Sequence, residues 1–364
     1  MKPGETGSPP DPSASRPATA LSPAELAERI AALGGEPFRA RQVEGSLFKG
    51  KALSWEEVKG LPGPLKEKLA ASFPLVSSRM KAVVQSPDGT RKMALLLADG
   101  VTVEAALIPS GKRRTLCLST QAGCPVGCRF CASGIGGLLR NLEAYEILEQ
   151  AFFAQHLLPP GEKVTHLVVM GVGEPLFNLE SLLQALDVLG SPASLGIGAR
   201  RVVVSTSGVP QGMRALSRRR PPLNLAVSLH TADQELREDL VPMAQRWTVG
   251  EILAEAGRYQ ESTGRRVTLE VVLLDGLTDT PRQARLLARA AAPRGFHVNL
   301  LAWNPVPDLP FRPSPPSRVK AFAGLLEKNG VNVTIRRSRG AGASAACGQL
   351  RRLGSPGLEE GATP

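Results

Sequence analysis

Seven runs of branched apolar residues alternate with six amphipathic segments between residues 111 and 340. The runs predict strands that start near residues 115, 165, 200, 224, 265, 297 and 331. The segments between them have apolar residues at helical spacing and predict helices at 143–158, 179–190, 209–219, 249–263, 280–293 and 317–330. Alternation of this kind predicts an α/β fold with a parallel sheet and right-handed crossovers. Because a closed barrel needs eight such units, we expect an open, partial (β/α)6-type barrel.

The residues before this region have a different pattern. Ser22 and Glu25 form a capping box that begins a predicted helix, and the three helices expected here are 23–34, 37–50 and 66–73. Alternating runs separated by Asp-Gly turns predict an antiparallel meander at 79–85, 91–97 and 101–108. We therefore expect a small α+β accessory domain over 21–110. Residues 1–20 are rich in Pro, Ser, Gly and Ala and predict a disordered tail, and 341–364 form a C-terminal segment.

The amino-acid composition limits the classes of partner that the protein could bind. Lys and Arg outnumber Asp and Glu by 44 to 33, a formal net charge of +11, which favours a polyanion such as RNA over a membrane surface. A basic protein without such a partner is the alternative. No apolar run approaches the ~18 residues of a membrane span, and the N-terminus lacks the apolar stretch of a signal peptide. We expect a cytoplasmic protein, whose five cysteines do not form a static disulfide framework.

The residues that could bind ligands or take part in catalysis gather where the predicted strands end. A cysteine-rich loop follows the first strand, and the other such segments are GVGEP (171–175), STSG (205–208), SLH (228–230) and WNP (303–305). The carboxyl ends of parallel strands share one edge of the sheet, where sites are built. These segments are therefore expected to converge on one site.

Three of the five cysteines, Cys124, Cys128 and Cys131, lie in the segment GCPVGCRFC (123–131). Thiolates select zinc, Cu(I) or iron–sulfur clusters. Structural zinc takes four ligands, for which Cys117 would have to be the fourth. A [4Fe-4S] cluster held by three cysteines instead leaves one iron free to bind a small chelating molecule.

Single residues near these strand ends allow two interpretations each. Gly171 and Gly173 let backbone approach a ligand, and Glu174 can accept a hydrogen bond from an ammonium group, although glycine-rich turns often only turn the chain. A lone histidine such as His230 is more often a hydrogen-bonded core residue than a ligand. A free buried cysteine, such as Cys117 or Cys347, is ordinarily a small apolar residue.

The C-x3-C-x2-C spacing, with Phe130 before the last cysteine, resembles the radical S-adenosylmethionine (SAM) superfamily. The whole pattern from about Leu21 to Leu350 resembles one family in it, the adenine-C2 methyltransferases of bacterial 23S rRNA and tRNA. The segments that carry this resemblance are PFRARQ, VEAALIP, RTLCLSTQAGCPVGCRFC, VVMGVGEP, STSGVP, LAVSLH, LLDGLTD, LLAWNPVP, RRSRG and AACGQL. Motifs of this length in this order are specific, and they imply a radical-SAM barrel.

The resemblance assigns a role to each matching residue. Cys124, Cys128 and Cys131 bind a [4Fe-4S] cluster, one per chain. SAM is bound by Gly173, Glu174, Ser205, Ser228, Leu229, His230 and Asn304. Cys347 carries the methyl group, Cys117 is its disulfide partner, and Glu104 accepts a proton. Without the resemblance, Glu104 would be read as a solvated strand carboxylate.

The implied chemistry suits C2 of adenine, an electron-poor carbon that cannot attack the methyl group of SAM. Cys347 first takes a methyl group by displacement, and a radical from a second SAM activates it, so that two SAM are consumed per methylation. The S-methylene group crosslinks to C2, Glu104 removes the C2 proton, and Cys117 attacks the sulfur of Cys347 to release the base. The partners implied are 23S rRNA, tRNA and a flavodoxin- or ferredoxin-like electron donor.

Recognition of RNA requires an unstacked adenine and contacts to phosphates. Candidate phosphate contacts are the basic runs 112–114, 218–220 and 336–337, each of which could equally be a solvated face. The chain departs from the family at 341–344, where Ala-Gly-Ala-Ser replaces an acidic stretch beside Cys347.

Two alternative functions remain open: methylation of C8 of the same rRNA adenine, and a non-catalytic iron–sulfur or zinc protein that binds RNA.

Overall fold

A ten-stranded sheet in the order β1-β2-β3-β4-β7-β8-β9-β10-β11-β12 is the core of the computed structural model, which describes residues 16–307 and 309–351. Seven strands from β4 onward run parallel to one another. They are β4 (Arg113–Cys117), β7 (His166–Val169), β8 (Val202–Thr206), β9 (Asn224–Ser228), β10 (Thr268–Leu273), β11 (His297–Ala302) and β12 (Asn332–Ile335). The predicted α/β fold with an open, partial barrel is confirmed, because β12 is an edge strand among the described residues.

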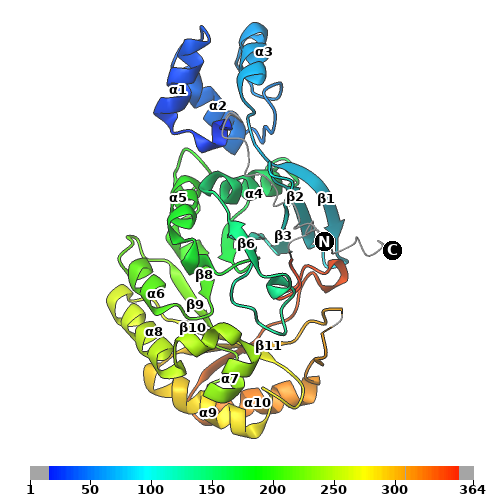
Figure 1. Ribbon diagram of the computed structural model, residues 1–364, viewed down its shortest axis with the longest axis vertical. Helices are drawn as coiled ribbons and strands as arrows, with labels where there is room; N and C mark the ends of the chain where they lie inside the picture. The colour runs from blue at the N-terminus through cyan, green and yellow to red at the C-terminus, as the bar shows by residue number, and fades with distance from the viewer. Residues whose placement is uncertain (1–15, 308, 352–364) are drawn as a thin grey trace, which may run out of the picture.

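The crossover helices line the outer side of the curved sheet (Figure 1). They are α4 (Ala144–His156), α5 (Leu179–Gly190), α6 (Pro210–Ser217), α7 (Gln234–Leu240), α8 (Val249–Thr263), α9 (Pro281–Ala291) and α10 (Pro316–Lys328). Fully buried Phe152, Tyr259 and Phe296 pack between helices and strands, each contributing roughly 1.5–3 kcal/mol by leaving water. Helix α7 was not predicted. None of the helices in the described part of the chain is long and apolar enough to cross a membrane.

Short 3-10 helices occupy several connections: η1 (Ala18–Ala20), η2 (Ala132–Gly134), η3 (Pro175–Phe177), η4 (Ala199–Arg201), η5 (Pro242–Arg246), η6 (Ala292–Arg294) and η7 (Ala341–Ala343). The first of them corrects the boundary of the expected disordered tail. Ala18 is buried, and its backbone N–H donates to the carbonyl of Pro74 at 2.9 Å. The remainder of that tail, residues 1–15, and residues 352–364 of the expected C-terminal segment lie outside the described residues.

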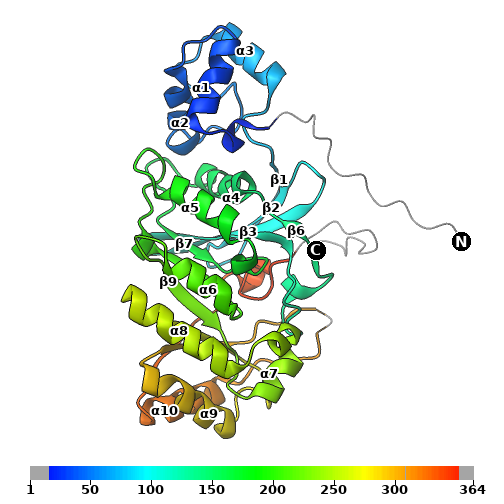
Figure 2. The same ribbon diagram turned by 60° about the vertical axis from the view of Figure 1, so that its left-hand side comes forward.

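The expected accessory region divides into two parts. Helices α1 (Pro23–Ala32), α2 (Arg39–Phe48) and α3 (Gly63–Ser72) form a group at one end of the molecule (Figure 2), and the capping box of Ser22 and Glu25 is present. Strands β1 (Arg79–Gln85), β2 (Arg91–Leu96) and β3 (Thr102–Ser110) form the expected antiparallel meander. However, β3 also pairs with β4, so the meander extends the main sheet, and no break between domains falls at residue 110.

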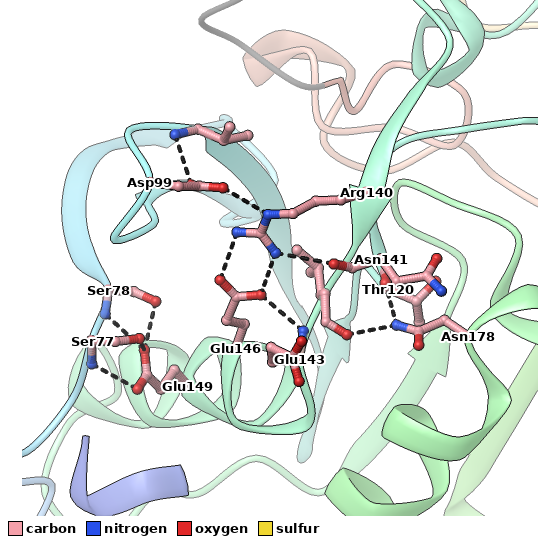
Figure 3. A network of polar contacts seen from close by, with 12 residues as sticks. Ser77, Ser78, Asp99, Thr120, Arg140, Asn141, Glu143, Glu146, Glu149 and Asn178 are labelled. Carbon is pink, nitrogen blue, oxygen red and sulfur yellow. Dashed lines mark hydrogen bonds and ion pairs between the residues drawn. The ribbon is translucent and has the colours of Figure 1, made fainter. Parts of the chain in front are cut away.

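A buried carboxylate joins the helical group to the barrel (Figure 3). Glu149 of α4 is fully buried and accepts hydrogen bonds from the backbone N–H groups and hydroxyls of Ser77 and Ser78, at 2.5–3.0 Å, and from the hydroxyl of Thr19 at 2.6 Å. These donors belong to the connection between α3 and β1 and to η1. Beside this cluster, Arg140 pairs with Glu146 and Asp99.

We expect Glu149→Ala to lower the free energy of unfolding by about 3 kcal/mol, because it leaves several buried donors without an acceptor. Urea denaturation, in which the midpoint falls, measures this change. The matched control is Glu67→Ala, which removes an exposed carboxylate of α3 and is expected to change the free energy by less than about 0.5 kcal/mol. Equal midpoints for the two variants would contradict this account of Glu149.

Candidate active site

The three clustered cysteines lie in the connection of a small hairpin formed by β5 (Gln121–Gly123) and β6 (Leu138–Asn141), which was not predicted. The hairpin depends on Gly123, whose φ is +85° and where a Cβ atom would lie 1.9 Å from the carbonyl oxygen of Gly137. Only glycine fits this position. The hairpin therefore closes the base of the cysteine loop and holds it beneath the strand ends.

A cavity of ≈ 160 Å³ lies between this loop and the carboxyl ends of the strands. The structure brings most of the expected site residues to its wall: Cys124, Cys128, Cys131, Gly173, Glu174, Ser205, Ser228, His230, Asn304 and Cys347. Leu229, Cys117 and Glu104 do not line it. The convergence expected from the ends of parallel strands is thus present.

The donor set suits an iron–sulfur cluster. Burial raises the pKa of Cys124 to about 12 and that of Cys128 well above its ordinary value, so these thiols are protonated in the metal-free protein and would release protons to a metal. Among the described residues, no three His, Cys, Asp or Glu side chains converge on a point that would hold a single ion. Thiols spread around a cavity match a cluster, in which each thiolate binds a different iron.

Two glycines of GVGEP are required by close backbone packing. A Cβ atom on Gly171 would lie 2.6 Å from the carbonyl oxygen of Leu118, and one on Gly173, with φ +111°, would lie 2.7 Å from Cβ of Gln121. Next to them, the buried carboxylate of Glu174 accepts from the backbone N–H and hydroxyl of Ser207 at 2.7 and 2.8 Å. Burial raises the pKa of Glu174, a shift that is frequent at functional sites.

The segment SLH ends strand β9 with an unusual backbone. His230 has a φ of +64°, which a residue with a side chain adopts only when its surroundings force it. Its ring packs edge-on against Phe130, with centroids 4.8 Å apart, and its Nδ1 accepts from the N–H of Val272 at 3.4 Å. Burial lowers the pKa of His230 to about 3, so the ring is neutral. Ser205 and Ser228 share a hydrogen bond of 3.1 Å.

The C-terminal segment, drawn in orange-red in Figure 1, contributes Cys347 and Gly348 to the wall of the first cavity. The carbonyl of Cys347 accepts from Asn304 Nδ2 at 3.0 Å, and the carbonyl of Gly348 accepts from the N–H of Ala132 in the cysteine loop at 2.8 Å. Just before residues 341–344, Asp88 of the β1–β2 turn accepts from the N–H of Gly340 at 2.9 Å. The segment is therefore positioned by N–H donors of Asn304 and Ala132 and by the carboxylate of Asp88.

A second cavity of ≈ 560 Å³ adjoins the first. Cys117 lines the second cavity, whereas Cys347 and Asn304 line both. All five cysteines are free thiols, so the disulfide that the resemblance implied between Cys117 and Cys347 is absent from this structure. Burial, reinforced by Cys347, raises the pKa of Cys117 to about 12, which keeps it as a thiol until a base or a cation intervenes.

The expected proton acceptor lies behind these cavities. Glu104 of β3 is buried, and its carboxylate pairs with Lys92 Nζ at 2.9 Å and accepts from the N–H of Arg351 at 2.9 Å. The second contact joins Glu104 to the segment that carries Cys347. Lys92, on the neighbouring strand, was not predicted to belong to the site.

Two further charged groups belong to the site: Arg336, which was expected only as a candidate phosphate contact, and Glu270, which was missed. Arg336 lines both cavities, so it is not simply one member of an exposed basic run. The pKa of Arg336 is raised: the electrostatic interaction with Cys347 is the largest cause, burial opposes it, and Glu270 raises the pKa further. Glu270 of β10 lines the first cavity, and its pKa is raised by burial.

The fold and the three-cysteine loop define a radical SAM protein, and residues 118–288 match the family model described as the radical SAM superfamily. The chain is 43% identical to a probable dual-specificity RNA methyltransferase RlmN from Rhodopirellula baltica, over 90% of this chain and 88% of that protein. It is 41% identical to the protein of the same name from Symbiobacterium thermophilum, over 92% and 91% of the two chains. The crystal structure of a radical SAM methyltransferase from Sphaerobacter thermophilus has 40% identity and a TM-score of 0.88, covering 92% of this chain and 99% of that one.

These similarities extend over nearly the whole chain and not only over the radical SAM domain. The chain belongs to the RlmN family of radical SAM methyltransferases. Membership implies a [4Fe-4S] cluster and the use of SAM, both of which match the chemistry of the cavity wall.

Proposed function

We propose that this protein methylates C2 of an adenine in 23S rRNA, and of an adenine next to the anticodon in tRNA, through a methyl group carried by Cys347. The observation that supports this most directly is the position of Cys347 in the wall between two cavities. A group on its sulfur can be loaded from the first cavity and delivered into the second. Relatives named dual-specificity RNA methyltransferases make RNA the expected acceptor.

In this proposal the first cavity binds the cluster and SAM. Cys124, Cys128 and Cys131 would each hold one iron of the cluster and would leave the fourth iron without a protein ligand, free to bind SAM. The bound cluster supplies the electron that splits SAM into methionine and a 5′-deoxyadenosyl radical. Gly173 allows the backbone to approach SAM, and Glu174, Ser205, Ser228, His230 and Asn304 offer polar contacts around it. Leu229 contributes through its backbone.

The second cavity is proposed to receive the target adenine. Its wall includes the four arginines Arg113, Arg336, Arg337 and Arg339 and no Asp or Glu. Guanidinium groups around a cavity suit the phosphates that flank an unstacked nucleotide. Cys117 and Cys347 both face this space, so a base held there can be joined to one sulfur and released by the other.

The chain's own residues perform the remaining steps. Cys347 displaces S-adenosylhomocysteine from SAM and so acquires the methyl group. After hydrogen abstraction and addition to C2, the adduct would pass one electron back to the bound cluster, and Glu104 takes the C2 proton. Cys117, as thiolate, then attacks the sulfur of Cys347 and forms a disulfide with it. The carbon–sulfur bond breaks, and the freed methylene carbon takes the bonding electron pair and one proton to become the methyl group. An electron donor of the flavodoxin or ferredoxin type and a cytoplasmic location complete the proposal.

Nucleoside mass spectrometry tests the function. We expect C2-methyladenosine in 23S rRNA and tRNA incubated with the reconstituted protein, SAM and a reductant, and none when SAM is omitted. Methylation at C8 of the rRNA adenine would favour the sister activity. Neither product, together with absence of reductive SAM cleavage, would favour a non-catalytic iron–sulfur protein that binds RNA.

Release of the methylated base is expected to accelerate with pH. The raised pKa of Cys117, about 12, means that its reactive thiolate is a minor species at neutral pH and increases about tenfold per pH unit below that pKa. This step is measured as the rate at which the protein–RNA crosslink decays at pH 7, 8 and 9, with samples quenched at successive times. A decay rate that does not change with pH would contradict attack by Cys117 as the slow step.

A further inference from the structure

Arg237 of α7 is among the largest side chains that are fully buried. Its guanidinium donates to two backbone carbonyls, from Nε to Leu229 at 3.2 Å and from Nη2 to Ser207 at 2.5 Å. Carbonyls satisfy hydrogen bonds but do not balance a full positive charge. Burial lowers the pKa of Arg237 to about 10, which still leaves it ionised at neutral pH.

The described polypeptide supplies no carboxylate to this cation: none of the ion pairs within residues 16–307 and 309–351 includes Arg237. Buried arginines are ordinarily paired. The acidic group that acts electrostatically on Arg237 is the thiol of Cys128. The other titratable group that it affects is His230, which is neutral.

Backbone contacts hold Arg237 on the cluster side of the site. One turn after Arg237, the carbonyl of Leu240 accepts from the N–H of Arg129, the residue that follows Cys128, at 3.0 Å. The N–H of Met243 in η5 donates to the carbonyl of Val126 at 3.4 Å. Helix α7 and the adjoining η5 are thus joined to the cysteine loop on both sides of Cys128, which fixes the cation relative to that ligand.

We propose that Arg237 is the buried countercharge of the iron–sulfur cluster and raises its reduction potential by stabilising the reduced state. The inference rests on the proposed cluster at Cys124, Cys128 and Cys131. Reduction adds one negative charge to a centre that already carries three thiolates. A fixed cation in a site of low dielectric stabilises that added charge more than it stabilises the oxidised centre. Arg237 is a positioning residue in this sense, since it acts through the cluster and contacts no substrate.

Arg129 provides a matched comparison. It is next to Cys128 in the sequence, but its side chain is 58% exposed and pairs with Asp239 at 2.6 Å. Water and its acidic partner screen that charge. If the effect of a charge on the reduction potential of the cluster increases with its burial, Arg237 has the larger effect on that potential and Arg129 has little.

The test is an anaerobic redox titration of the cluster, followed by electron paramagnetic resonance. The full-length protein is compared with Arg237→Lys, Arg237→Gln, Arg237→Met and Arg129→Gln, after reconstitution and iron and sulfide analysis. We expect Arg237→Gln and Arg237→Met to shift the midpoint to more negative potentials. Arg237→Lys, which keeps the charge, and Arg129→Gln should stay close to the wild type.

Wild-type midpoints for the glutamine and methionine variants would overturn the proposal. So would an equal shift in the lysine and glutamine variants, because hydrogen-bond geometry would then be the cause. If Arg237→Gln and Arg237→Met alone fail to retain four irons while Arg237→Lys titrates as the wild type does, the positive charge is still the determinant, and the proposal stands. Loss of the cluster from all three Arg237 variants would overturn the proposal. A wild type that titrates normally but methylates no RNA would refute the proposed function alone.

Discussion

Replacement of Cys347 by alanine is expected to abolish RNA methylation while leaving the cluster and reductive SAM cleavage intact. The expected loss is at least about 10⁴-fold, the scale on which removal of a covalent nucleophile acts. The cluster ligands come from another loop, and Cys347 meets the first cavity only at its wall. The methyl carrier is therefore separable from the radical-forming machinery.

Two products measured in one reaction test this separation. 5′-Deoxyadenosine reports SAM cleavage, and C2-methyladenosine reports transfer to RNA. Cys347→Ser is the closest control in size, and its weakly nucleophilic hydroxyl should also fail to accept a methyl group. Intact-mass analysis should find the added methyl group on wild-type protein and on neither variant. Full methylation by Cys347→Ala would exclude the assigned carrier.

The elements that could be predicted are those with long, strong periodicity. The bounds of α5 and α8 agree with the predicted ranges 179–190 and 249–263, because each helix has a continuous apolar stripe. Helix α7 has only seven residues, too few for a period to emerge. The β5–β6 hairpin was missed because its strands have three and four residues and enclose a glycine-rich loop.

Contacts between residues that are far apart in the sequence were harder to predict than individual helices and strands. The meander at 79–108 was predicted, but its pairing with β4 was not. That pairing depends on which edge of the main sheet is free, and alternation within a strand does not contain that information. The convergence of the site residues could be predicted, because strand direction alone places the carboxyl ends together. The partners of buried charged residues could not be predicted. Lys92 reaches Glu104 from the neighbouring strand, and the residues around Arg237 in the sequence do not reveal that its side chain is buried.

Replacement of Cys117 by alanine is expected to stop the reaction after a single crosslinking event. The S-methylene bridge between Cys347 and C2 would form as before, because Cys117 takes no part in the earlier steps. Its resolution requires a second thiol, and Cys117 is the other cysteine that lines the second cavity. Protein–RNA adduct should therefore accumulate to about one per active site, and multiple turnover should be lost.

Denaturing gel electrophoresis should show a band of Cys117→Ala protein that shifts with RNA and collapses on ribonuclease treatment. Mass spectrometry of the digest should then place the nucleotide on Cys347. The double variant Cys117→Ala/Cys347→Ala is the control and should give no adduct. Free turnover by Cys117→Ala would remove the resolving role. The two sulfurs line the same cavity, as attack of one on the other requires.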